Sequence, residues 1–278
     1  MIHSSAIIEK GAKLADDIEV GPFCYIGPNV DIGPGNKLIN SVTILGKTTI
    51  GERNRFHPFS VIGGDPQDLK YRGEDSETII GNNNIFRENC TVNKGTEVGG
   101  GRTVIGNQNY LMACSHIAHD TIIEDHCILA NTCLLAGHIK IENWAILSGN
   151  VMVHHFVTVG QHAFIGGMSR INQDTPPFMI CQGLNGEIRG LNSVGLRRRG
   201  FSEESINLLR DAHRKIWRSD GPTSEVLTQI ETESGSNTEI QTLLDFLRAS
   251  GKGKMGRARE GGENGSPNKP QPEANLSE

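Results

Sequence analysis

The segment VIGNQNYLMACSHIAHDTIIEDHCIL, residues 104–129, carries a large aliphatic residue at every sixth position. The series runs through Ile105, Leu111, Ile117, Ile123 and Leu129. A period of six fits neither the turn of an α-helix nor the alternation of a flat strand. It fits a short strand followed by a bend, and three such units of six residues close a triangular coil of 18 residues.

The same register extends far beyond this segment in both directions. Twenty-five aliphatic or phenylalanine residues lie in phase between Ile8 and Ile171, with two interruptions. Internal repeats of this kind are typical of solenoids, in which each unit buries its apolar side against its neighbours. We therefore expect a mainly β protein, in which residues 1–190 form a parallel β-helix of hexapeptide repeats.

The positions that flank the aliphatic residue also follow a pattern. Two positions before it the chain tends to place a small side chain, which would fill a tight corner of the coil interior. Four of the six cysteines are explained as small buried residues in this way: Cys24, Cys90, Cys127 and Cys133. One position after it many repeats have glycine, as at Gly51 and Gly81, where we expect glycine to ease a bend.

Two insertions interrupt the repeat, at residues 63–79 and 93–104. Insertions into a solenoid form loops on its surface, and loops positioned by a rigid scaffold often carry binding residues. Both insertions are therefore candidate binding elements.

The pattern changes after Ile171. The segment QDTPPFM breaks the repeat, because consecutive prolines cannot join a strand ladder. Helical spacing of apolar residues then predicts three helices: one from Ser202, one from about Ser224 and one that carries Ile240, Leu243 and Leu247. We expect residues 191–250 to form a C-terminal α-helical subdomain. Residues 251–278 have almost no apolar content, which predicts a disordered tail.

Composition excludes several classes of function. The net charge of −5 gives no general attraction to nucleic acid or to an anionic membrane. No stretch approaches the ~18 apolar residues of a spanning helix, and the first 20 residues lack a targeting pattern. The cysteines form no CxxC pair, so we expect no structural metal and a reduced, cytoplasmic protein.

The coil brings histidines together, because residues 18 apart stack in neighbouring turns. His119, Gly137 and His155 share one column, while Asp120 and His138 share the next. Asp120 can fix the tautomer of His119, and the bare backbone of Gly137 can offer an N–H to an oxyanion. This arrangement predicts a general base acting on a hydroxyl.

The histidine cluster is also compatible with a metal site or with a site that has no catalytic role. His126 and His162 are expected to be structural. A zinc site of the kind that trimeric β-helices of the gamma carbonic anhydrase class hold between subunits is the main rival, since about three converging imidazoles would suffice. A scaffold or sugar-binding β-helix without turnover is the third hypothesis.

Six motifs stand out along the chain: PQDLKY (66–71), HIAHD (116–120), LLAGH (134–138), VHHF (153–156), QDTPPF (173–178) and GLNSVGLRRRGF (190–201). Together they resemble one family, the acyl carrier protein-dependent UDP-N-acetylglucosamine O-acyltransferases, which begin lipid A biosynthesis. The resemblance covers residues 1 to about 250 in order. It implies a left-handed β-helix, a homotrimer, and transfer of a 3-hydroxyacyl chain from acyl carrier protein to the sugar 3-hydroxyl without a cofactor. N-acylation of a 3-amino UDP-sugar by the same base is the nearest alternative.

The resemblance implies a role for individual residues. His119 matches the catalytic base, Asp120 its orienting partner and Gly137 the oxyanion donor. The residues that match substrate-binding positions are Gln67, Asp68, Lys70, His116, His138, His154, His155, Asn192, Arg198 and Arg199. Among them, Asn192, Arg198 and Arg199 match the nucleotide and phosphate end, where a guanidinium suits a diphosphate.

Some positions depart from the family or bear on specificity. His155, Asn93 and Val194 stand where members often have other residues, which concerns affinity more than reaction type. The resemblance implies that Gly167 falls where family members limit the acyl chain through side-chain bulk, so a longer chain is expected, although Met168 beside it could shorten the groove. The basic run 197–199, with further basic residues up to Arg218, is expected to attract the acidic acyl carrier protein.

Overall fold

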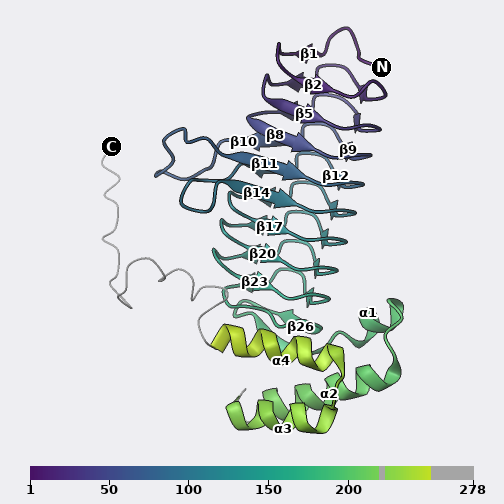
Figure 1. Ribbon diagram of the computed structural model, residues 1–278, viewed down its shortest axis with the longest axis vertical. Coiled ribbons are helices and arrows are strands. Elements are labelled where there is room, and N and C mark those ends of the chain that lie inside the picture. The colour runs from purple at the N-terminus through teal and green to yellow at the C-terminus, as the bar shows by residue number, and fades with distance from the viewer. Residues whose placement is uncertain (219–222, 252–278) are drawn as a thin grey trace.

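The computed structural model describes residues 1–218 and 223–251, and it is a left-handed parallel β-helix followed by α-helices. The coils stack along the long axis of the molecule, with the N-terminus at one end and the helices at the other (Figure 1). The tail predicted for residues 251–278 falls, apart from Gly251, outside the described residues.

Short strands form the three flat sides of the coil, and each side is one sheet. The first sheet contains β1 (Ile7–Ile8), β4 (Tyr25–Ile26), β7 (Thr43–Ile44), β10 (Val61–Gly64), β13 (Thr91–Asn93), β16 (His116–Ile117), β19 (Leu134–Leu135), β22 (Met152–Val153) and β25 (Arg170–Ile171). The second contains β2 (Lys13–Leu14), β5 (Val30–Ile32), β8 (Lys47–Ile50), β11 (Glu77–Ile80), β14 (Arg102–Ile105), β17 (Ile122–Ile123), β20 (Lys140–Ile141) and β23 (Thr158–Val159). The third contains β3 (Glu19–Val20), β6 (Lys37–Leu38), β9 (Arg55–Phe56), β12 (Ile85–Phe86), β15 (Tyr110–Leu111), β18 (Ile128–Leu129), β21 (Ile146–Leu147), β24 (Phe164–Ile165), β26 (Met179–Gln182) and β27 (Glu187–Leu191).

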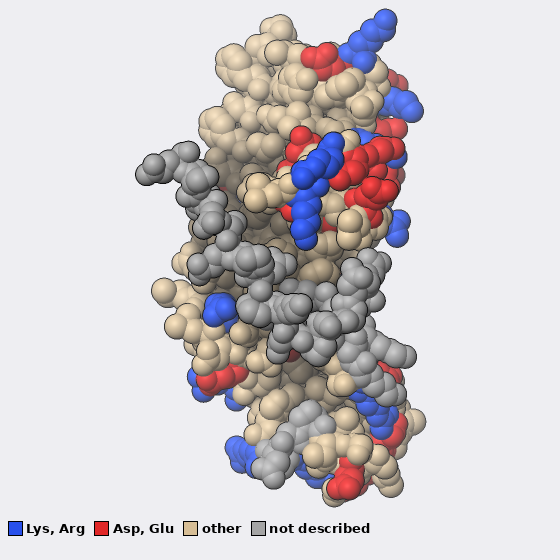
Figure 2. Space-filling view, turned by 90° about the vertical axis from the view of Figure 1, so that its left-hand side faces the viewer, with Lys and Arg blue, Asp and Glu red and all other residues tan. Residues whose placement is uncertain are grey.

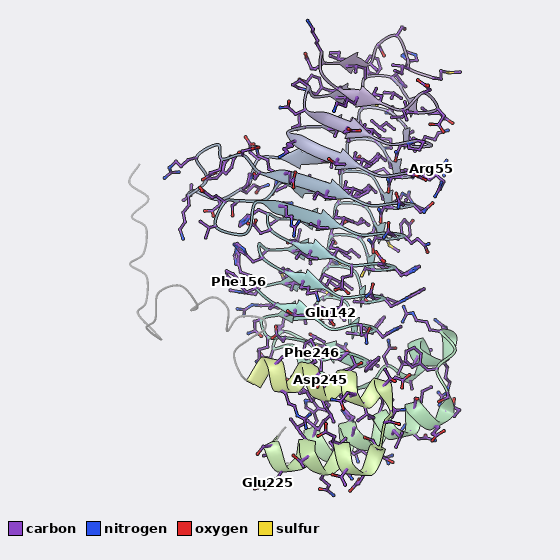
Figure 3. All side chains as sticks on the ribbon, in the orientation of Figure 1. Arg55, Glu142, Phe156, Glu225, Asp245 and Phe246 are labelled. Atoms are coloured by element: carbon purple, nitrogen blue, oxygen red, sulfur yellow. The ribbon has the colours of Figure 1, made fainter. Side chains whose placement is uncertain are left out.

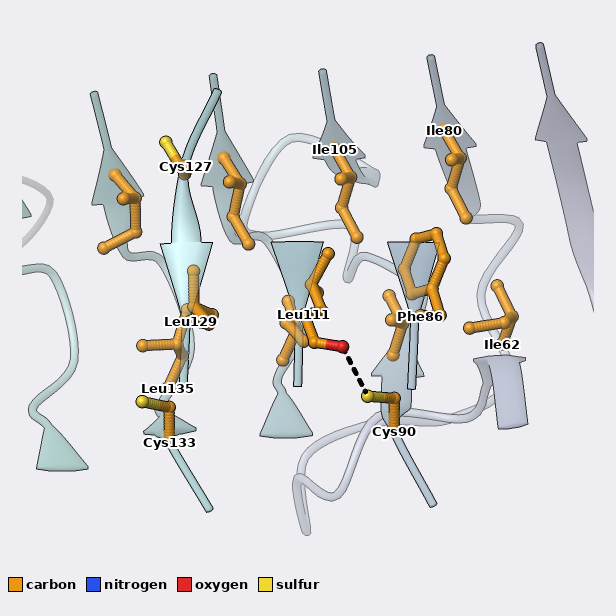
Figure 4. Packing of buried hydrophobic residues seen from close by; sticks show 14 of the residues in the cluster. Ile62, Ile80, Phe86, Cys90, Ile105, Leu111, Cys127, Leu129, Cys133 and Leu135 are labelled. Atoms are coloured by element: carbon orange, nitrogen blue, oxygen red, sulfur yellow. Dashed lines mark hydrogen bonds between the residues drawn. The ribbon is translucent and has the colours of Figure 1, made fainter. Parts of the chain in front are cut away.

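The residues of the six-residue register fill the interior of the coil, as predicted. Ile117 pairs with Leu135, and Leu135 pairs with Val153, so residues 18 apart lie in register on neighbouring strands. All of the in-phase residues except Ile8 and Leu14 are almost fully buried in one continuous core. The predicted corner cysteines are buried among them (Figure 4).

The glycines that follow the register residue have a different role from the one predicted. The bends fall two positions later, at non-glycine residues with positive φ such as Asp120 and His138. Gly51 and Gly81 do not have positive φ, but a Cβ there would lie 2.8 and 2.6 Å from a carbonyl oxygen of the next coil. These glycines therefore allow neighbouring coils to approach closely. Gly63, with φ +76°, is an exception that does form a bend.

One corner of the coil is filled by asparagines instead of small residues. The ladder consists of Asn36, Asn54, Asn84 and Asn109. The side-chain oxygen of each of the first three accepts a hydrogen bond of 2.8 Å from the backbone N–H of the next asparagine in the ladder. The last oxygen accepts from the N–H of Cys127 at 2.7 Å. The ladder satisfies backbone donors that the bend would otherwise leave unpaired.

The helical region packs on the last coil through a second core. Its helices are α1 (Ser193–Arg198), α2 (Glu203–Trp217), α3 (Ser224–Ser234) and α4 (Thr238–Gly251). The three predicted helices are present, and Ser202 caps α2 by accepting from the N–H of Ser205. Phe178 and Met179 of the coil join the core of the helices. None of the described helices has the length and apolar character that a membrane span needs.

The coil resumes after the prolines, within the range 1–190 predicted for it, because β26 pairs in parallel with β24. Two other features of this region were not predicted. β27 then turns back and pairs antiparallel with β26. The short helix α1 follows at once, so the chain leaves the coil through a hairpin.

Candidate active site

His119 and Asp120 form a buried hydrogen-bonded pair at the corner between β16 and β17. The His119 Nδ1 lies 2.7 Å from the Asp120 Oδ2, and each residue is only 6% exposed. With the carboxylate ionised, Nδ1 donates the proton, and Nε2 keeps a lone pair that can accept one. The pair therefore has the chemistry of an oriented general base.

The second insertion surrounds the Asp120 carboxylate. The backbone N–H of Thr96 donates to Oδ1 at 2.8 Å, and the Thr96 hydroxyl donates to Oδ2 at 2.6 Å. Burial alone would raise the pKa of Asp120, but the hydrogen bonds from His119 and Thr96 outweigh it and hold the pKa below its ordinary value. Asp120 therefore stays ionised at neutral pH.

Gly137 lies directly against the imidazole of His119, as the 18-residue column predicted. A Cβ on Gly137 would be 2.6 Å from the His119 Cε1 and 2.8 Å from Nε2. The next residue continues the stacking, because the His138 N–H donates to the His119 carbonyl at 3.0 Å. The Gly137 N–H has no acceptor among the described residues. The glycine thus leaves room beside the base and a donor that a reactant can use.

His138 completes a cluster around the same carboxylate. The His138 Nδ1 lies 3.8 Å from the Asp120 Oδ2, and the His138 ring meets the His119 ring edge-on. The Phe156 ring stacks on the His138 ring, with the ring centres 4.5 Å apart. His119, Asp120 and His138 form a group whose ligand atoms lie within 4.8 Å of one another, a spacing that could hold a metal ion. It offers two imidazoles, whereas the zinc interpretation required about three.

The remaining predicted histidines lie around this pair. His116 is on β16, and its Nδ1 lies 2.7 Å from the Thr91 hydroxyl. Burial, and secondarily the charge of His119, lowers the pKa of His116. His154 and His155 follow β22 at the same corner one coil below Gly137, with their rings 5.3 Å apart. His155 is exposed.

Both inserted loops leave the coil at this same corner, since each joins a strand of the first sheet to a strand of the second. They project from one edge of the coil, and Phe156 lies on that edge (Figure 3). Charged side chains of both signs gather there (Figure 2). On the first loop Gln67 and Lys70 are exposed, and Asp68 accepts a hydrogen bond from the Lys70 N–H at 2.9 Å.

Four predicted site residues lie away from the corner that holds His119: Gly167, Asn192, Arg198 and Arg199. Gly167 is exposed at a different corner, between β24 and β25, where an added Cβ would meet nothing closer than 3.4 Å. Asn192 is buried, accepts from the Gly195 N–H as the cap of α1, and donates to the His162 carbonyl at 3.0 Å.

The two arginines lie at the third corner and beyond it. The Arg199 guanidinium sits 5.1 Å from the centre of the Trp144 ring, between β20 and β21. Burial lowers its pKa, and its Nη1 is a buried donor without an acceptor in the described part of the chain. Arg198 is exposed. A single chain therefore does not bring Gly167, Asn192, Arg198 or Arg199 to His119.

The expected basic surface on the helices is neutralised in part. Arg197 pairs with Glu203, Arg214 pairs with Asp211, and Lys215 contacts Glu233. From Ser193 to Gly251 the sequence has eight basic and nine acidic residues. Arg198, Arg199 and Arg210 form no ion pair in the described part of the chain, so the attraction of an acidic partner stays a prediction.

Sequence reasoning missed Thr96, the residue that holds the Asp120 carboxylate. None of the six motifs contains it, and an isolated threonine in a glycine-rich insertion has no distinctive spacing. The available signal was topological: an insertion between sheets one and two must return to the corner that holds His119.

Comparison with known proteins gives one consistent family. A model described as UDP-N-acetylglucosamine O-acyltransferase, domain 2, matches residues 174–255, and a model of bacterial transferase hexapeptide repeats matches residues 102–137. The chain is 44% identical over 252 residues to the acyl-(acyl-carrier-protein)–UDP-N-acetylglucosamine O-acyltransferase of Thermodesulfovibrio yellowstonii, a match that covers 91% of this chain and 98% of that protein.

Solved structures agree with the sequence match. The UDP-N-acetylglucosamine acyltransferase of Bacteroides fragilis superposes with a TM-score of 0.87 at 44% identity, covering 90% of this chain and 98% of that one. The Arabidopsis UDP-N-acetylglucosamine acyltransferase gives a TM-score of 0.79 at 37% identity, with 90% and 96% covered. The chain therefore belongs to the family of acyl carrier protein-dependent UDP-N-acetylglucosamine O-acyltransferases.

Proposed function

We propose that this protein transfers a 3-hydroxyacyl chain from acyl carrier protein to the 3-hydroxyl of UDP-N-acetylglucosamine, the first step of lipid A biosynthesis. The observation that carries the proposal is the His119–Asp120 pair beside the bare Gly137 backbone, in a chain that matches this family over almost its whole length. The reaction uses no cofactor, because a base and an oxyanion donor suffice for acyl transfer.

The chemistry begins at the His119 Nε2. This nitrogen takes the proton of the sugar hydroxyl while the oxygen attacks the thioester carbon, and a C–O bond forms. The Gly137 N–H donates to the resulting oxyanion. When the C–S bond breaks, His119 returns the proton to the leaving thiolate, and Asp120 stabilises the positive imidazolium in between. General base catalysis of this kind contributes about 10²–10⁴-fold.

The substrates would bind along the edge that carries the inserted loops. His116, His138, His154 and His155 surround the pair, and the first loop adds Gln67, Asp68 and Lys70. His119 is almost fully buried, so little bulk water reaches the base. Excluding water from the reaction site protects the thioester from competing hydrolysis.

A homotrimer would complete the site. Gly167, Asn192, Arg198 and Arg199 lie away from the His119 corner in one chain, so a second copy would supply them. A threefold arrangement places a different corner of the neighbouring prism against each His119 corner. Arg198 and Arg199 would then hold the diphosphate of UDP.

Two further observations support proposals on the acyl chain and the compartment. Gly167 leaves space at its corner, which favours a longer chain, while Met168 is exposed beside it. The cysteines are unpaired, and burial raises the pKa of the Cys127 and Cys133 thiols to about 12 and about 11. Unpaired thiols suit a reducing cytoplasm.

The decisive experiment is an acyl-transfer assay with 3-hydroxyacyl carrier protein and UDP-N-acetylglucosamine. We expect wild-type turnover, and a decrease of about 10²–10⁴-fold in His119→Ala because the base is lost. His57→Ala is the matched control and should remain active, since His57 lies between β9 and β10, where its Nδ1 is 3.1 Å from the Glu88 carboxylate, and belongs to no part of the proposed site. Equal rates for wild type and His119→Ala would contradict the mechanism.

The same assay separates the acceptor and chain-length alternatives. A 3-amino UDP-sugar tests N-acylation, and a strong preference for it would replace the O-acyl proposal. Acyl carrier protein thioesters of several chain lengths test the role of Gly167. A preference for a short chain that Met168→Ala does not lengthen would contradict it.

A further inference from the structure

The second loop, residues 94–101 between β13 and β14, folds back onto the Asp120 carboxylate. One residue of this loop holds both oxygens: the Thr96 N–H donates to Oδ1 and the Thr96 hydroxyl donates to Oδ2. Thr96 is 6% exposed, so these bonds are shielded from water. Hydrogen bonds to a buried carboxylate are stronger than those between neutral groups.

The Thr96 hydroxyl and the imidazole of His119 share one acceptor. His119 lies 2.7 Å and the Thr96 hydroxyl 2.6 Å from the same Oδ2. The orientation of the carboxylate, and with it the direction of the imidazole, is thus fixed by a donor other than the base itself.

The backbone of the second loop packs against the Asp120 carboxylate. A Cβ on Gly99 would lie 1.9 Å from the Asp120 Cγ, so the loop backbone rests directly on the carboxyl group. The Asp120 N–H donates to the Thr103 hydroxyl at 2.9 Å. The loop therefore closes over the side chain of Asp120, while β14 anchors its backbone.

We propose that Thr96 is a positioning residue for acyl transfer, acting through Asp120 to orient His119 and to set how tightly the pair holds its proton. This inference rests on the proposed function, and it assigns Thr96 no contact with substrate. It gives the second insertion a defined task in the proton transfer.

The other end of the loop is bound to the first loop. The Lys94 ammonium lies 3.1 Å from the Asp65 carboxylate and 5.2 Å from the centre of the Tyr71 ring. The first loop carries the residues proposed to contact substrate. The two ends of the second loop should therefore have separable effects: Lys94 on substrate binding, and Thr96 on the chemical step.

The test compares Thr96→Val with Thr96→Ser. Valine keeps the shape and the backbone N–H but removes the hydroxyl, whereas serine keeps the hydroxyl. We expect Thr96→Val to lower kcat about ten- to hundredfold with both KM values nearly unchanged, and Thr96→Ser to restore most of it. Thr48→Val is the matched control, because its buried hydroxyl donates to the Leu45 carbonyl in a coil closer to the N-terminus.

The pH profile of kcat separates a positioning role of Thr96 from a general loss of loop structure. With one donor fewer, Oδ2 holds the proton of the pair more tightly, so the acidic limb of kcat should move to higher pH in Thr96→Val. Lys94→Met should raise KM and leave this limb in place. Should Thr96→Val fail to fold, Thr96→Cys, with its weaker donor, should give an intermediate kcat.

Three outcomes would overturn the inference. They are a Thr96→Val enzyme with the wild-type kcat and pH profile, equal losses in the valine and serine variants, or a rise in KM alone. An active wild type with an unaffected Thr96→Val would refute only this inference. An inactive wild type would refute the proposed function and the inference with it.

Discussion

Two corners of this β-helix carry stacked aromatic rings, and they differ in the groups that surround their histidines. At the first corner His138 stacks on Phe156 at 4.5 Å with an interplanar angle of 3°. At the second, His126 stacks on Trp144 at 3.9 Å with an angle of 7°, and His162 follows at 6.2 Å. The backbone is the same at both, because all five of these residues have positive φ.

The neighbours of the histidines make the difference. His119 has a carboxylate on Nδ1 and a glycine beside Nε2, which together orient the ring and leave space for a reactant. His162 is buried, its Nδ1 has no hydrogen-bond partner in the described residues, and Arg199 lies nearby. Burial, and secondarily the charge of Arg199, lowers the pKa of His162 to about 4. A histidine in a repeat is thus a candidate base only when the next residues supply a carboxylate and space.

The largest effect expected from this difference is at Gly137. In Gly137→Ala the new methyl group would overlap the imidazole of His119, and the displaced ring should lower kcat at least on the order of 100-fold. Gly149 is the matched control, because it occupies the same repeat position at another corner and a Cβ there lies 3.5 Å from the Asn131 carbonyl oxygen. Steady-state acyl-transfer rates measure both.

One outcome for the two glycine variants would contradict this prediction. If Gly137→Ala and Gly149→Ala retain similar activity while both remain folded, the space beside His119 is not used in the reaction. Thermal unfolding of the two variants checks folding independently of activity.

A smaller effect is expected at the second corner, on stability. The pKa of His162 is lower in the folded protein than the ordinary 6.5, so between pH 6.5 and about 4 the unfolded chain binds a proton that the folded chain does not. Stability therefore falls as pH falls through this window, by on the order of 3 kcal/mol in total. His162→Phe should remove this part of the pH dependence, because phenylalanine does not titrate.

The measurement is the free energy of unfolding in denaturant at pH 7 and pH 5, for wild type and His162→Phe. The wild type should lose more stability than the variant on acidification. Identical losses would mean that His162 is protonated in the folded state, which would remove the contrast between the corners.

The sequence predicted most of the fold because the physics of the repeat is local. A six-residue apolar period can be buried only by a coil, and the coil then fixes which residues stack, so the contact between His119 and Gly137 followed from counting. The exit from the coil through β27 and α1 did not, because a short hairpin and a six-residue helix have no periodicity of their own. The role of Gly51 and Gly81 was predicted wrongly. A glycine needed for close approach to the next coil and a glycine needed for a bend look the same in the sequence.

The candidate site was predictable only where the repeat governs it. His119, Asp120 and His138 lie in register, whereas Thr96 lies in an insertion whose path depends on tertiary contacts. Arg199 was named from family resemblance, and its position on Trp144 depends on how α1 packs against the coil. Neither contact has a sequence period from which it could be derived.

The central claim is that His119 is the base for the sugar hydroxyl, and a crystal structure with UDP-N-acetylglucosamine tests it most directly. We expect the 3-hydroxyl oxygen within hydrogen-bonding distance of the His119 Nε2, with Arg199 of a second copy at the diphosphate. A sugar bound away from the His119–Asp120 pair, or a 3-hydroxyl directed away from His119, would contradict this assignment.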